Sequence, residues 1–366
     1  MKRVLCVVSS LNAGGAETFL MKVFRTTDKS KYVFDFVVSA DGIYEEEVLQ
    51  LGGKVYKVPL RTKNPVKVFN EIKKIVKENN YKYFFKLADT PTGGILDVLA
   101  AKFGGAKWIS VRSCNASTNS SPLKEAINAF LRPIFNLLVQ CKIAPSDLAA
   151  AYTFGQREID KNNVHFINNG VDLDIFKYEG TNRKEIRSEF NVPEDANLIG
   201  HVGRFTHQKN HEFLLKIFEE IYKKNNNSFL LLVGIGELQE HIHGIVESLE
   251  CKNNVIFAGL RRDVPKILSA LDLFLLPSFY EGMPNVVIES QATGLPCLIS
   301  NTITREANIT NLVTYVSLNE NPCIWADEAL KLCELERKDT KNDFIQHAYD
   351  IQTVANTLIT LLFQEF

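Results

Sequence analysis

The pattern that most limits the fold of this chain is a repeated alternation of short apolar runs with longer amphipathic stretches. Apolar runs bounded by turn residues indicate strands, and stretches with an apolar period near 3.6 residues indicate helices. The alternation occurs in both halves of the chain, which predicts an α/β protein with two doubly wound parallel sheets. The expected strands are 3–9, 32–38, 54–58, 82–87, 107–111 and 141–144, then 198–203, 229–233, 254–258, 272–276 and 296–299.

Size and composition suit two globular domains. The chain has 366 residues, of which 45% are hydrophobic and 23% are charged; this is ordinary for a soluble protein. Turn residues at 168–172 predict the joint, with domains 1–168 and 169–348 and an apolar final segment 349–366. No run is long enough for a membrane span, and the start lacks a signal-peptide pattern. The seven cysteines include no C-x-x-C pair, so we expect reduced thiols and a cytoplasmic protein.

The segment from Glu281 to Glu289 follows an apolar run at 273–276 and carries the strongest functional signal. Pro284 suits the first position of a helix, where no amide donor is needed. The amides near Asn285 and Val286 would then form an anion site at the carboxyl end of a strand. Two carboxylates beside such a site fit hydrogen bonds from ligand hydroxyls. The alternative is a solvated helix start whose acidic residues are favoured by the helix dipole.

Two further loops also join a strand to a helix. In the first, Gly203-Arg204 and Lys209 follow the run 198–202, and an arginine and a lysine there can hold a diphosphate without a metal ion. In the second, Gly14 and Gly15 follow the run 3–9, and glycines let a ligand approach the backbone closely. The alternative for the first loop is a pair of ordinary surface cations. The glycine pair is no nucleotide-binding fingerprint by itself.

Together these loops resemble the family 4 (group 1) retaining glycosyltransferases of GT-B fold, and in particular those of bacterial capsule and exopolysaccharide synthesis. The resemblance runs over nearly the whole chain. The matching residues are Gly14 to Glu17, Asn169 to Asp172, Gly203 to Phe205, Gln208 to Asn210, Gly234 to Glu237, Glu281 to Glu289 and Thr302 to Glu306. The family implies two Rossmann-like domains, the first for an acceptor and the second for a nucleotide sugar. It also implies that the final segment crosses back to the first domain as a helix.

The resemblance also implies roles for individual residues. Arg204 and Lys209 would stabilise the leaving diphosphate, Glu281 would bind the donor sugar and Glu289 the ribose. The remaining donor-binding residues would be Gly14, Gly15, Gly203, Gly234, Leu260, Arg261, Gly282, Met283, Pro284, Asn285 and Val286. Leu260 and Arg261 would lie at the base, and the glycine pair at the phosphate. The implied reaction transfers a sugar, with retention, from a nucleotide diphosphate, expected to be a UDP-sugar, to a glycan or a lipid-linked acceptor. It needs no cofactor and no metal.

The sequence departs from the family at one place that bears on the acceptor. Many relatives have a histidine after the strand written here as 108–111, whereas this chain has Arg112 to Asn115, and no histidine precedes His165. A first-domain histidine is therefore excluded as base or ligand. Arg112 and Asn115 are candidates for binding an anionic acceptor group, with a structural salt bridge of Arg112 as the alternative. Asp172 and Asp174 resemble a metal-binding Asp-x-Asp, but they lie at the predicted joint, so we expect no metal there.

Charge is unevenly distributed along the chain. Residues 1–165 contain 24 Lys and Arg against 15 Asp and Glu, a net of +9, whereas residues 166–366 contain 18 against 28, a net of −10. The basic half could attract an anionic membrane leaflet. The apolar helix expected at 126–139 could lie in the membrane interface. The alternative for the basic residues is an ordinary solvated helix face. The alternative for the segment 126–139 is a core helix of the first domain. No nucleic acid partner is expected.

Two other functions stay open at this point. A nucleotide-sugar 2-epimerase shares the two-sheet architecture, but it needs acid and base side chains in the site, and a first half without histidine disfavours it. An inactive partner subunit could bind a nucleotide sugar and support another transferase. The presence of Arg204, Lys209, Glu281 and Glu289 argues against an inactive subunit, and the missing first-domain histidine argues for it.

Overall fold

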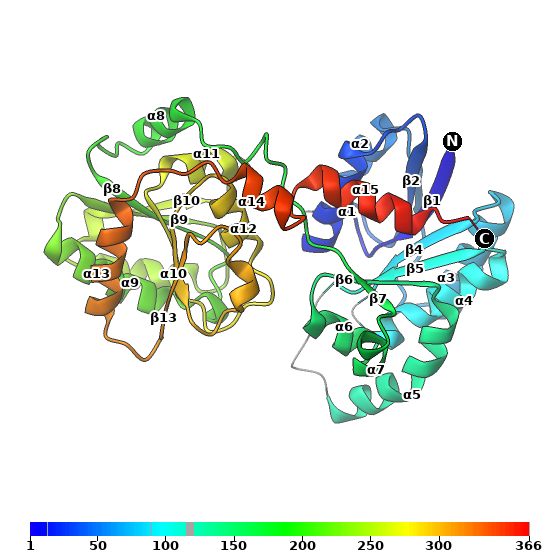
Figure 1. The fold of residues 1–366 in the computed structure, drawn as a ribbon. Helices are drawn as coiled ribbons and strands as arrows, with labels where there is room; N and C mark the ends of the chain where they lie inside the picture. Colours follow the sequence, from blue (N-terminus) through cyan, green and yellow to red (C-terminus); the bar gives the residue numbers. More distant parts are fainter. Residues whose placement is uncertain (13, 89, 115–120, 366) are drawn as a thin grey trace. The chain divides into compact units, whose positions relative to one another are not determined.

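The chain forms two separate compact units. The computed structural model describes residues 1–12, 14–88, 90–114 and 121–365 (Figure 1). Unit 1 comprises Met1–Gly170 and Ala348–Phe366, and unit 2 comprises Val171–His347. Unit 1 ends at Gly170, within the turn residues 168–172 and two residues after the expected domain end at 168, and the return segment starts one residue earlier than expected.

Unit 1 contains a parallel sheet of seven strands in the order β3-β2-β1-β4-β5-β6-β7. Its strands are β1 Lys2–Val7, β2 Tyr32–Val38, β3 Val55–Lys57, β4 Tyr83–Leu87, β5 Trp108–Arg112, β6 Cys141–Ala144 and β7 Val164–Phe166. Its helices are α1 Gly15–Thr26, α2 Glu45–Gln50, α3 Pro65–Glu78, α4 Pro91–Gly104, α5 Pro122–Leu138, α6 Asp147–Thr153, α7 Gln156–Asp160 and α15 Ile351–Leu362. The strand order reverses between β1 and β4, and open α/β sheets bind ligands at the carboxyl ends beside such a switch point.

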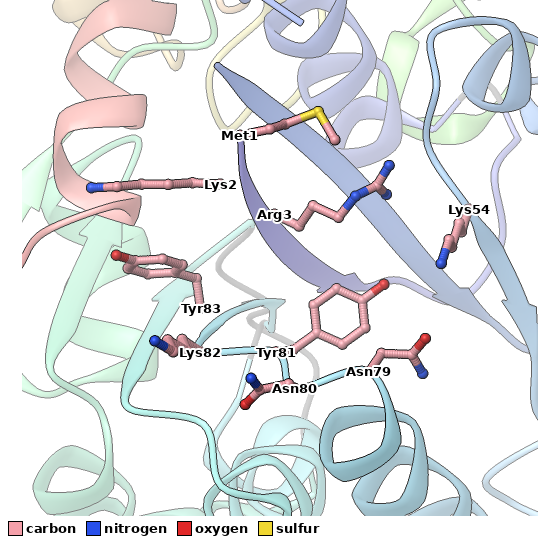
Figure 2. A pocket seen from close by; sticks show the side chains of 9 residues that line it. All are labelled: Met1, Lys2, Arg3, Lys54, Asn79, Asn80, Tyr81, Lys82 and Tyr83. Carbon is pink, nitrogen blue, oxygen red and sulfur yellow. The ribbon is translucent and has the colours of Figure 1, made fainter. Parts of the chain in front are cut away.

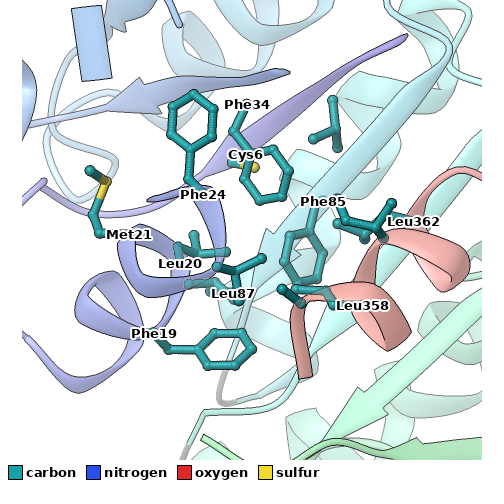
Figure 3. Packing of buried hydrophobic residues seen from close by; sticks show 14 of the residues in the cluster. Cys6, Phe19, Leu20, Met21, Phe24, Phe34, Phe85, Leu87, Leu358 and Leu362 are labelled. Atoms are coloured by element: carbon teal, nitrogen blue, oxygen red, sulfur yellow. The ribbon is translucent and has the colours of Figure 1, made fainter. Parts of the chain in front are cut away.

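Helix α15 completes the core of unit 1 from the far end of the chain. Asp350 caps its start by accepting a hydrogen bond from the amide of Thr353 at 3.0 Å. Two of its buried leucines, Leu358 and Leu362, lie around Phe85 in one apolar cluster with α1 and β1 (Figure 3). The final segment therefore packs on unit 1 because its apolar face fills the space beside α1.

Unit 2 contains a parallel sheet of six strands in the order β10-β9-β8-β11-β12-β13. Its strands are β8 Asn197–Val202, β9 Ser228–Val233, β10 Val255–Gly259, β11 Leu273–Leu276, β12 Cys297–Ser300 and β13 Val313–Val316. Its helices are α8 Gly180–Glu189, α9 His211–Lys224, α10 Gln239–Glu247, α11 Val264–Ala270, α12 Asn285–Ala292, α13 Pro322–Cys333 and α14 Lys341–Gln346, with 3-10 turns η1 His207–Lys209, η2 Lys252–Asn254 and η3 Arg305–Ala307. The order reverses between β8 and β11, which places the second switch point there.

Both sheets agree with the α/β class expected from the sequence, and most expected strands occur within a few residues. The last strand of unit 2, β13, was not expected. It is short, and its middle residues Thr314 and Tyr315 are half-buried. A short edge strand of this kind lacks the continuous apolar run of a strand that is covered on both faces.

Candidate nucleotide-sugar site

A pocket of about 330 Å³ lies at the switch point of unit 2, and we call it the unit 2 pocket. It is formed by the end of β8, the loop that includes η1, and the loop between β11 and α12. The residues that line it are Val202, Gly203, Arg204, Thr206, Gln208, Lys209, Glu281, Met283, Pro284, Asn285 and Val286. Two loops about seventy residues apart in sequence thus meet because β8 and β11 are neighbours in the sheet.

An ion pair joins these two loops. The Nζ atom of Lys209 lies 2.7 Å from Oε1 of Glu281, and the two side chains are 16% and 9% exposed. The amide of Gln208 donates to Oε2 of Glu281 at 3.2 Å and to the carbonyl of Tyr280 at 2.9 Å. Glu281 is therefore held as an acceptor at a fixed place in the pocket. Its lone pairs allow it to accept ligand hydroxyls as well.

Arg204 contributes a second cation to the same pocket. Its side chain is exposed, and it forms no hydrogen bond or ion pair with the residues that the structure describes. The lining contains two cations and one carboxylate, so the pocket has a net positive charge. The planar guanidinium of Arg204 can bind two oxygens of a phosphate at once.

Glycine is required where the β8 and β9 loops meet. Gly234 has φ +137°, and a Cβ atom there would lie 2.0 Å from the carbonyl oxygen of Gly203. The amide of Gly234 donates to the carbonyl of Gly259 at 2.8 Å, so the ends of β8, β9 and β10 are joined side by side. Gly203 lines the pocket, whereas Gly234 supports it from behind.

Helix α12 begins with its first turn at the pocket. The prediction that Pro284 is its first residue was wrong by one position: Pro284 is the N-cap, and the helix starts at Asn285. The physical reason is that ψ of Pro284 is 91°, outside the helical region. Asn285 and Val286 line the pocket, and first-turn amides have no acceptor within their own helix. Glu289 is half-buried one turn further along and does not belong to the lining.

The residues predicted to contact a base lie in the loop after β10. Leu260 is 71% exposed. The guanidinium of Arg261 is bound by Asp263, with Nε to Oδ1 at 2.8 Å, and by Glu189, with Nη2 to Oε2 at 3.0 Å. These hydrogen bonds raise the pKa of Arg261. Because these carboxylates bind the guanidinium of Arg261, its contact with a base stays a prediction. Neither residue lines the unit 2 pocket, and Gly282 does not line it either.

The glycine pair of unit 1 lies at the start of α1. Gly14 is the N-cap with extended backbone, and the helix begins at Gly15. A Cβ atom on Gly14 would lie 2.3 Å from Oε2 of Glu17, whereas one on Gly15 would have open space around it. The carboxylate of Glu17 thus lies against Gly14, the space beside Gly15 is open, and binding of a phosphate at this pair stays a prediction.

Arg112 is buried inside unit 1. It is 1% exposed, its Nη2 donates to Oδ1 of Asn169 at 2.7 Å, and its guanidinium carbon lies 3.9 Å from the ring centroid of Phe19. Burial lowers the pKa of Arg112 to about 10. No described carboxylate forms an ion pair with it, so the salt bridge considered above is absent. This geometry describes a packing role, and binding of an acceptor by Arg112 stays a prediction. Asn115 lies outside the described residues.

Two histidines that sequence reasoning left without a role lie behind the unit 2 pocket. The rings of His201 and His211 are 4.7 Å apart, and both side chains are buried. Nδ1 of His201 lies 2.9 Å from the carbonyl oxygen of Leu275. Burial, together with the charge of Lys209, lowers the pKa of His211 to about 4 and moves the pKa of His201 well below its usual value. Both rings are therefore neutral near pH 7.

A further pocket, of about 460 Å³, lies at the switch point of unit 1, and we call it the unit 1 pocket. The ends of β1 and β2 and the side chains of Arg61 and Lys86 contribute to it. Sequence reasoning did not identify it. One available signal was Lys86, a lysine inside an otherwise apolar strand, and another was Asp97 inside an apolar helix, because charged residues are rarely fully buried unless they are paired.

Figure 2 shows another basic pocket of unit 1, of about 410 Å³, formed by Met1 to Arg3, Lys54 and the residues 79–83. It lies at the amino ends of β1 and β4, the edge where such sheets do not bind their ligands. Asp35 accepts from Arg3 at 2.5 Å and from the hydroxyl of Tyr81 at 2.7 Å. Because these groups satisfy one another, we assign this pocket no role.

No helix in the described part of the chain is both long and apolar enough to cross a membrane.

Comparison with known proteins agrees with this geometry. Residues 182–351 match the family described as "Glycosyl transferases group 1". The chain is 33% identical over 377 residues to the protein named "Putative glycosyltransferase EpsF" of Bacillus subtilis (strain 168), and the match covers 98% of this chain and 96% of EpsF. It is 33% identical over 147 residues to an Escherichia coli UDP-Gal:alpha-D-GlcNAc-diphosphoundecaprenol alpha-1,3-galactosyltransferase, covering 39% of this chain and 38% of that enzyme.

Among solved structures, Anabaena HepE in complex with UDP-glucose is similar, with a TM-score of 0.71 and 17% identity over 99% of this chain and 97% of HepE. This likeness concerns the fold, which is GT-B. With the match to EpsF along nearly its whole length, the chain belongs to the group 1 glycosyltransferase family and is itself a glycosyltransferase.

Proposed function

We propose that this glycosyltransferase transfers a sugar, with retention of anomeric configuration, from a UDP-sugar to a glycan or lipid-linked acceptor during surface polysaccharide synthesis. The observation that carries the proposal is the unit 2 pocket, where Arg204, Lys209 and the first turn of α12 converge. The names of two relatives support the choice of donor, because one contains UDP-Gal and the other was solved with UDP-glucose.

The pocket supplies what a leaving diphosphate needs. As the bond between the anomeric carbon and the diphosphate oxygen breaks, negative charge grows on the diphosphate. Arg204 and Lys209 lie where they can stabilise that charge, together with the amides of Asn285 and Val286. Glu281, held by Lys209 and Gln208, would accept hydrogen bonds from the donor sugar. We place the ribose at Glu289, one turn along α12.

Retention follows if the acceptor hydroxyl attacks from the face that the diphosphate leaves. The new bond then forms between the acceptor oxygen and the anomeric carbon, and the acceptor proton passes to a diphosphate oxygen. This route requires no protein base. Glu281 is the one carboxylate among the described residues that line the pocket, and its oxygens already accept from Lys209 and Gln208. The stereochemistry is read directly by NMR of the product, and an inverted linkage would exclude this route.

We also propose that donor use needs no metal ion, because Arg204 and Lys209 provide the counter-charge. Turnover should then be unchanged by EDTA. Complete loss with EDTA and recovery with magnesium or manganese would contradict this part of the proposal.

The proposal is tested against an inactive subunit and an epimerase by following a UDP-sugar alone. A transferase releases UDP slowly by hydrolysis and faster when an acceptor is added. An epimerase would instead change the sugar without acceptor and without a transferred product, and an inactive subunit would bind the donor and release nothing.

A membrane-facing surface on unit 1 is a further part of the proposal. Helix α5 presents a stripe of exposed apolar side chains at alternating spacings of four and three residues, namely Leu123, Ile127, Phe130, Ile134 and Leu137. Leu137 is 83% exposed and Phe130 76%. Helix α4 contacts both α5 and α3, and Lys67, Lys73, Lys74 and Lys77 of α3 are exposed. We propose that this stripe inserts into the interface of an anionic membrane.

Vesicle sedimentation tests the surface. Phosphatidylglycerol vesicles should bind the wild-type protein, less strongly in high salt, and the variant Leu123→Ser/Phe130→Ser/Leu137→Ser should bind much less. Ile324→Ser/Leu335→Ser/Ile345→Ser in unit 2 is the matched control, since these side chains are also exposed. Equal binding by the two triple variants would show that the stripe has no such role.

A further inference from the structure

The unit 1 pocket holds a group of charged residues that the proposed donor chemistry does not use. Lys86 of β4 and Arg61, from the loop before α3, both line it. Behind them lies Asp97 of α4, which is 0% exposed; its Oδ2 lies 3.1 Å from Nζ of Lys86 and also accepts from Arg61. Two cations therefore share one carboxylate, and the group has a net charge of +1.

The hydrogen-bonding capacity of the two cations is only partly used. The three donors of Lys86 have two recorded acceptors, Oδ2 of Asp97 at 3.1 Å and the carbonyl of Val7 at a weak 3.5 Å. Of the five N–H groups of Arg61, one is bound to Asp97 and one donates to the carbonyl of Gly93 at 2.8 Å. Among the described residues the other donors have no acceptor. Since both side chains line the pocket, these donors are available to a ligand.

The rest of the pocket lining contains apolar side chains such as Val58 and Leu60, and its polar part fits a hydroxyl-bearing ligand. None of its described residues is acidic, and Ser9, Ser10, Ser39 and Thr62 provide hydroxyl groups. The pocket also occupies the reversal point between β1 and β4, at the carboxyl ends of the strands, where sheets of this kind bind ligands. Asp97 fixes the two cations in place without facing the ligand itself, because it does not belong to the lining.

From this arrangement we propose that the unit 1 pocket binds the acceptor through an oxyanion that it carries, so that the acceptor is an anionic carbohydrate. Arg61 and Lys86 would bind a phosphate or carboxylate group, and the serine and threonine hydroxyls would bind neighbouring sugar hydroxyls. This inference rests on the proposed function, because only a transferase has an acceptor to bind. It moves the anion site from Arg112, which is buried against Phe19, to a pocket with free donors.

The test is an NMR titration of the full-length protein labelled with deuterium and 15N. Four probes are compared: glucose 1-phosphate, glucuronate, inorganic phosphate and neutral glucose. At least one of the two anionic sugars should shift the backbone amides of Ser9, Ser10 and Ser39 with an affinity tenfold or more above that of glucose. A response to glucose 1-phosphate alone identifies a phosphate-bearing acceptor, and a response to glucuronate alone identifies a uronic acid. Glucose binding as tightly as both anionic sugars would overturn the proposal, and so would the absence of shifts at these amides.

Two matched variants assign the effect to the charged group. Arg61→Gln should weaken binding of the anionic sugar at least tenfold, whereas Lys63→Gln makes the same charge change in an exposed neighbour outside the lining and should leave it within twofold. Thermal melts establish that each variant is folded. Equal affinities of Arg61→Gln and Lys63→Gln would overturn the proposal.

The same samples separate this inference from the proposed function. UDP should shift the amides of Gly203 and Val286 in unit 2. If UDP fails to do so while the anionic sugar shifts Ser9, the donor assignment fails and the anion site stands. If UDP binds as expected and the anionic sugars do not, the donor assignment stands and the inference fails.

Discussion

The two switch-point pockets use the same charged groups in different ways. Each has a lysine and an arginine in its lining and one carboxylate paired with the lysine: Lys209, Arg204 and Glu281 in unit 2, and Lys86, Arg61 and Asp97 in unit 1. In unit 2 the carboxylate lines the pocket and the arginine is unpaired among the described residues. In unit 1 the carboxylate lies behind both cations.

This difference decides what each pocket can recognise. The unit 2 pocket offers a fixed acceptor as well as cations, so it suits a ligand that has both sugar hydroxyls and a diphosphate. The described lining of the unit 1 pocket offers cationic donors and small hydroxyls, and no carboxylate, so it favours an anion. Equal net charge therefore does not imply equal ligands, because the position of the carboxylate sets the pattern of donors and acceptors.

The largest expected effect concerns the lysine of unit 2. Lys209→Met removes a cation from the leaving diphosphate, and we expect the rate of UDP release to fall about 10²–10³-fold, or about 3–4 kcal/mol. Lys216→Met is the matched control, because Lys216 is exposed on α9 outside the pocket. If the rate of UDP release fell equally in both variants, the effect could not be assigned to the place of Lys209 in the pocket.

Next in size is the contrast between the two glutamates. Glu289→Ala should weaken UDP binding about tenfold or more, because a hydrogen bond to a charged group contributes about 1.5–3 kcal/mol. Glu281→Ala should leave UDP binding unchanged or tighter, since it releases Lys209 from its ion pair, while sugar transfer falls. Calorimetry with UDP and a transfer assay measure the two quantities. Equal losses of UDP affinity would refute the assignment of sugar and ribose.

Because His201 and His211 are buried in unit 2, we expect acid to destabilise unit 2 more than unit 1. In the native state the pKa of His211 is lowered to about 4, whereas in the unfolded chain it is about 6.5. Between these pH values the unfolded state binds more protons at His211 than the native state does. The contribution of His211 to the free energy of unfolding is therefore full above pH 6.5 and is lost as pH falls toward 4. For His211 this amounts to at most about 3 kcal/mol. Unit 1 contains only His165.

Urea unfolding of a Trp108→Phe variant, in which Trp325 reports on unit 2, measures this loss at pH 7.5 and pH 5. His211→Phe should reduce the pH dependence, because Phe fills the same apolar space against Phe205 and does not titrate. An unchanged slope in that variant would show that His211 is not the titrating group.

A smaller effect concerns the backbone that supports the unit 2 pocket. Gly234→Ala should destabilise unit 2 by about 1–3 kcal/mol, since φ is +137° and the new Cβ would meet the carbonyl of Gly203. Gly244→Ala, on the surface of α10 with nothing near its Cβ, should instead stabilise by about 0.5–1 kcal/mol. Chemical unfolding measures the stability of both variants. A Gly234→Ala variant as stable as the wild type would show that the loops do not require the close contact between Gly234 and the carbonyl of Gly203.

The sequence predicted the two sheets and the unit 2 loops because these features are local. Apolar runs such as Leu273–Leu276 mark buried strands, and the loops at Arg204 and Glu281 each follow such a run. The ion pair between Lys209 and Glu281 could not be predicted, because it depends on β8 lying beside β11. The unit 1 pocket was missed for the same reason: Arg61, Lys86 and Asp97 come from a loop, a strand and a helix with no shared motif. Arg112 looked available in sequence, and its burial against Phe19 became visible only with the packing of α1.

Binding of the donor nucleotide in unit 2 is tested by comparing the UDP affinities of two arginine variants by calorimetry. Arg204→Gln should weaken UDP binding about tenfold or more, because a charge-assisted hydrogen bond to phosphate is lost. Arg61→Gln, the corresponding change in unit 1, should leave UDP affinity within about twofold, since a substitution away from the binding site has little effect. If Arg61→Gln weakens UDP binding as much as Arg204→Gln, or if Arg204→Gln has no effect, the donor nucleotide does not bind at the unit 2 pocket.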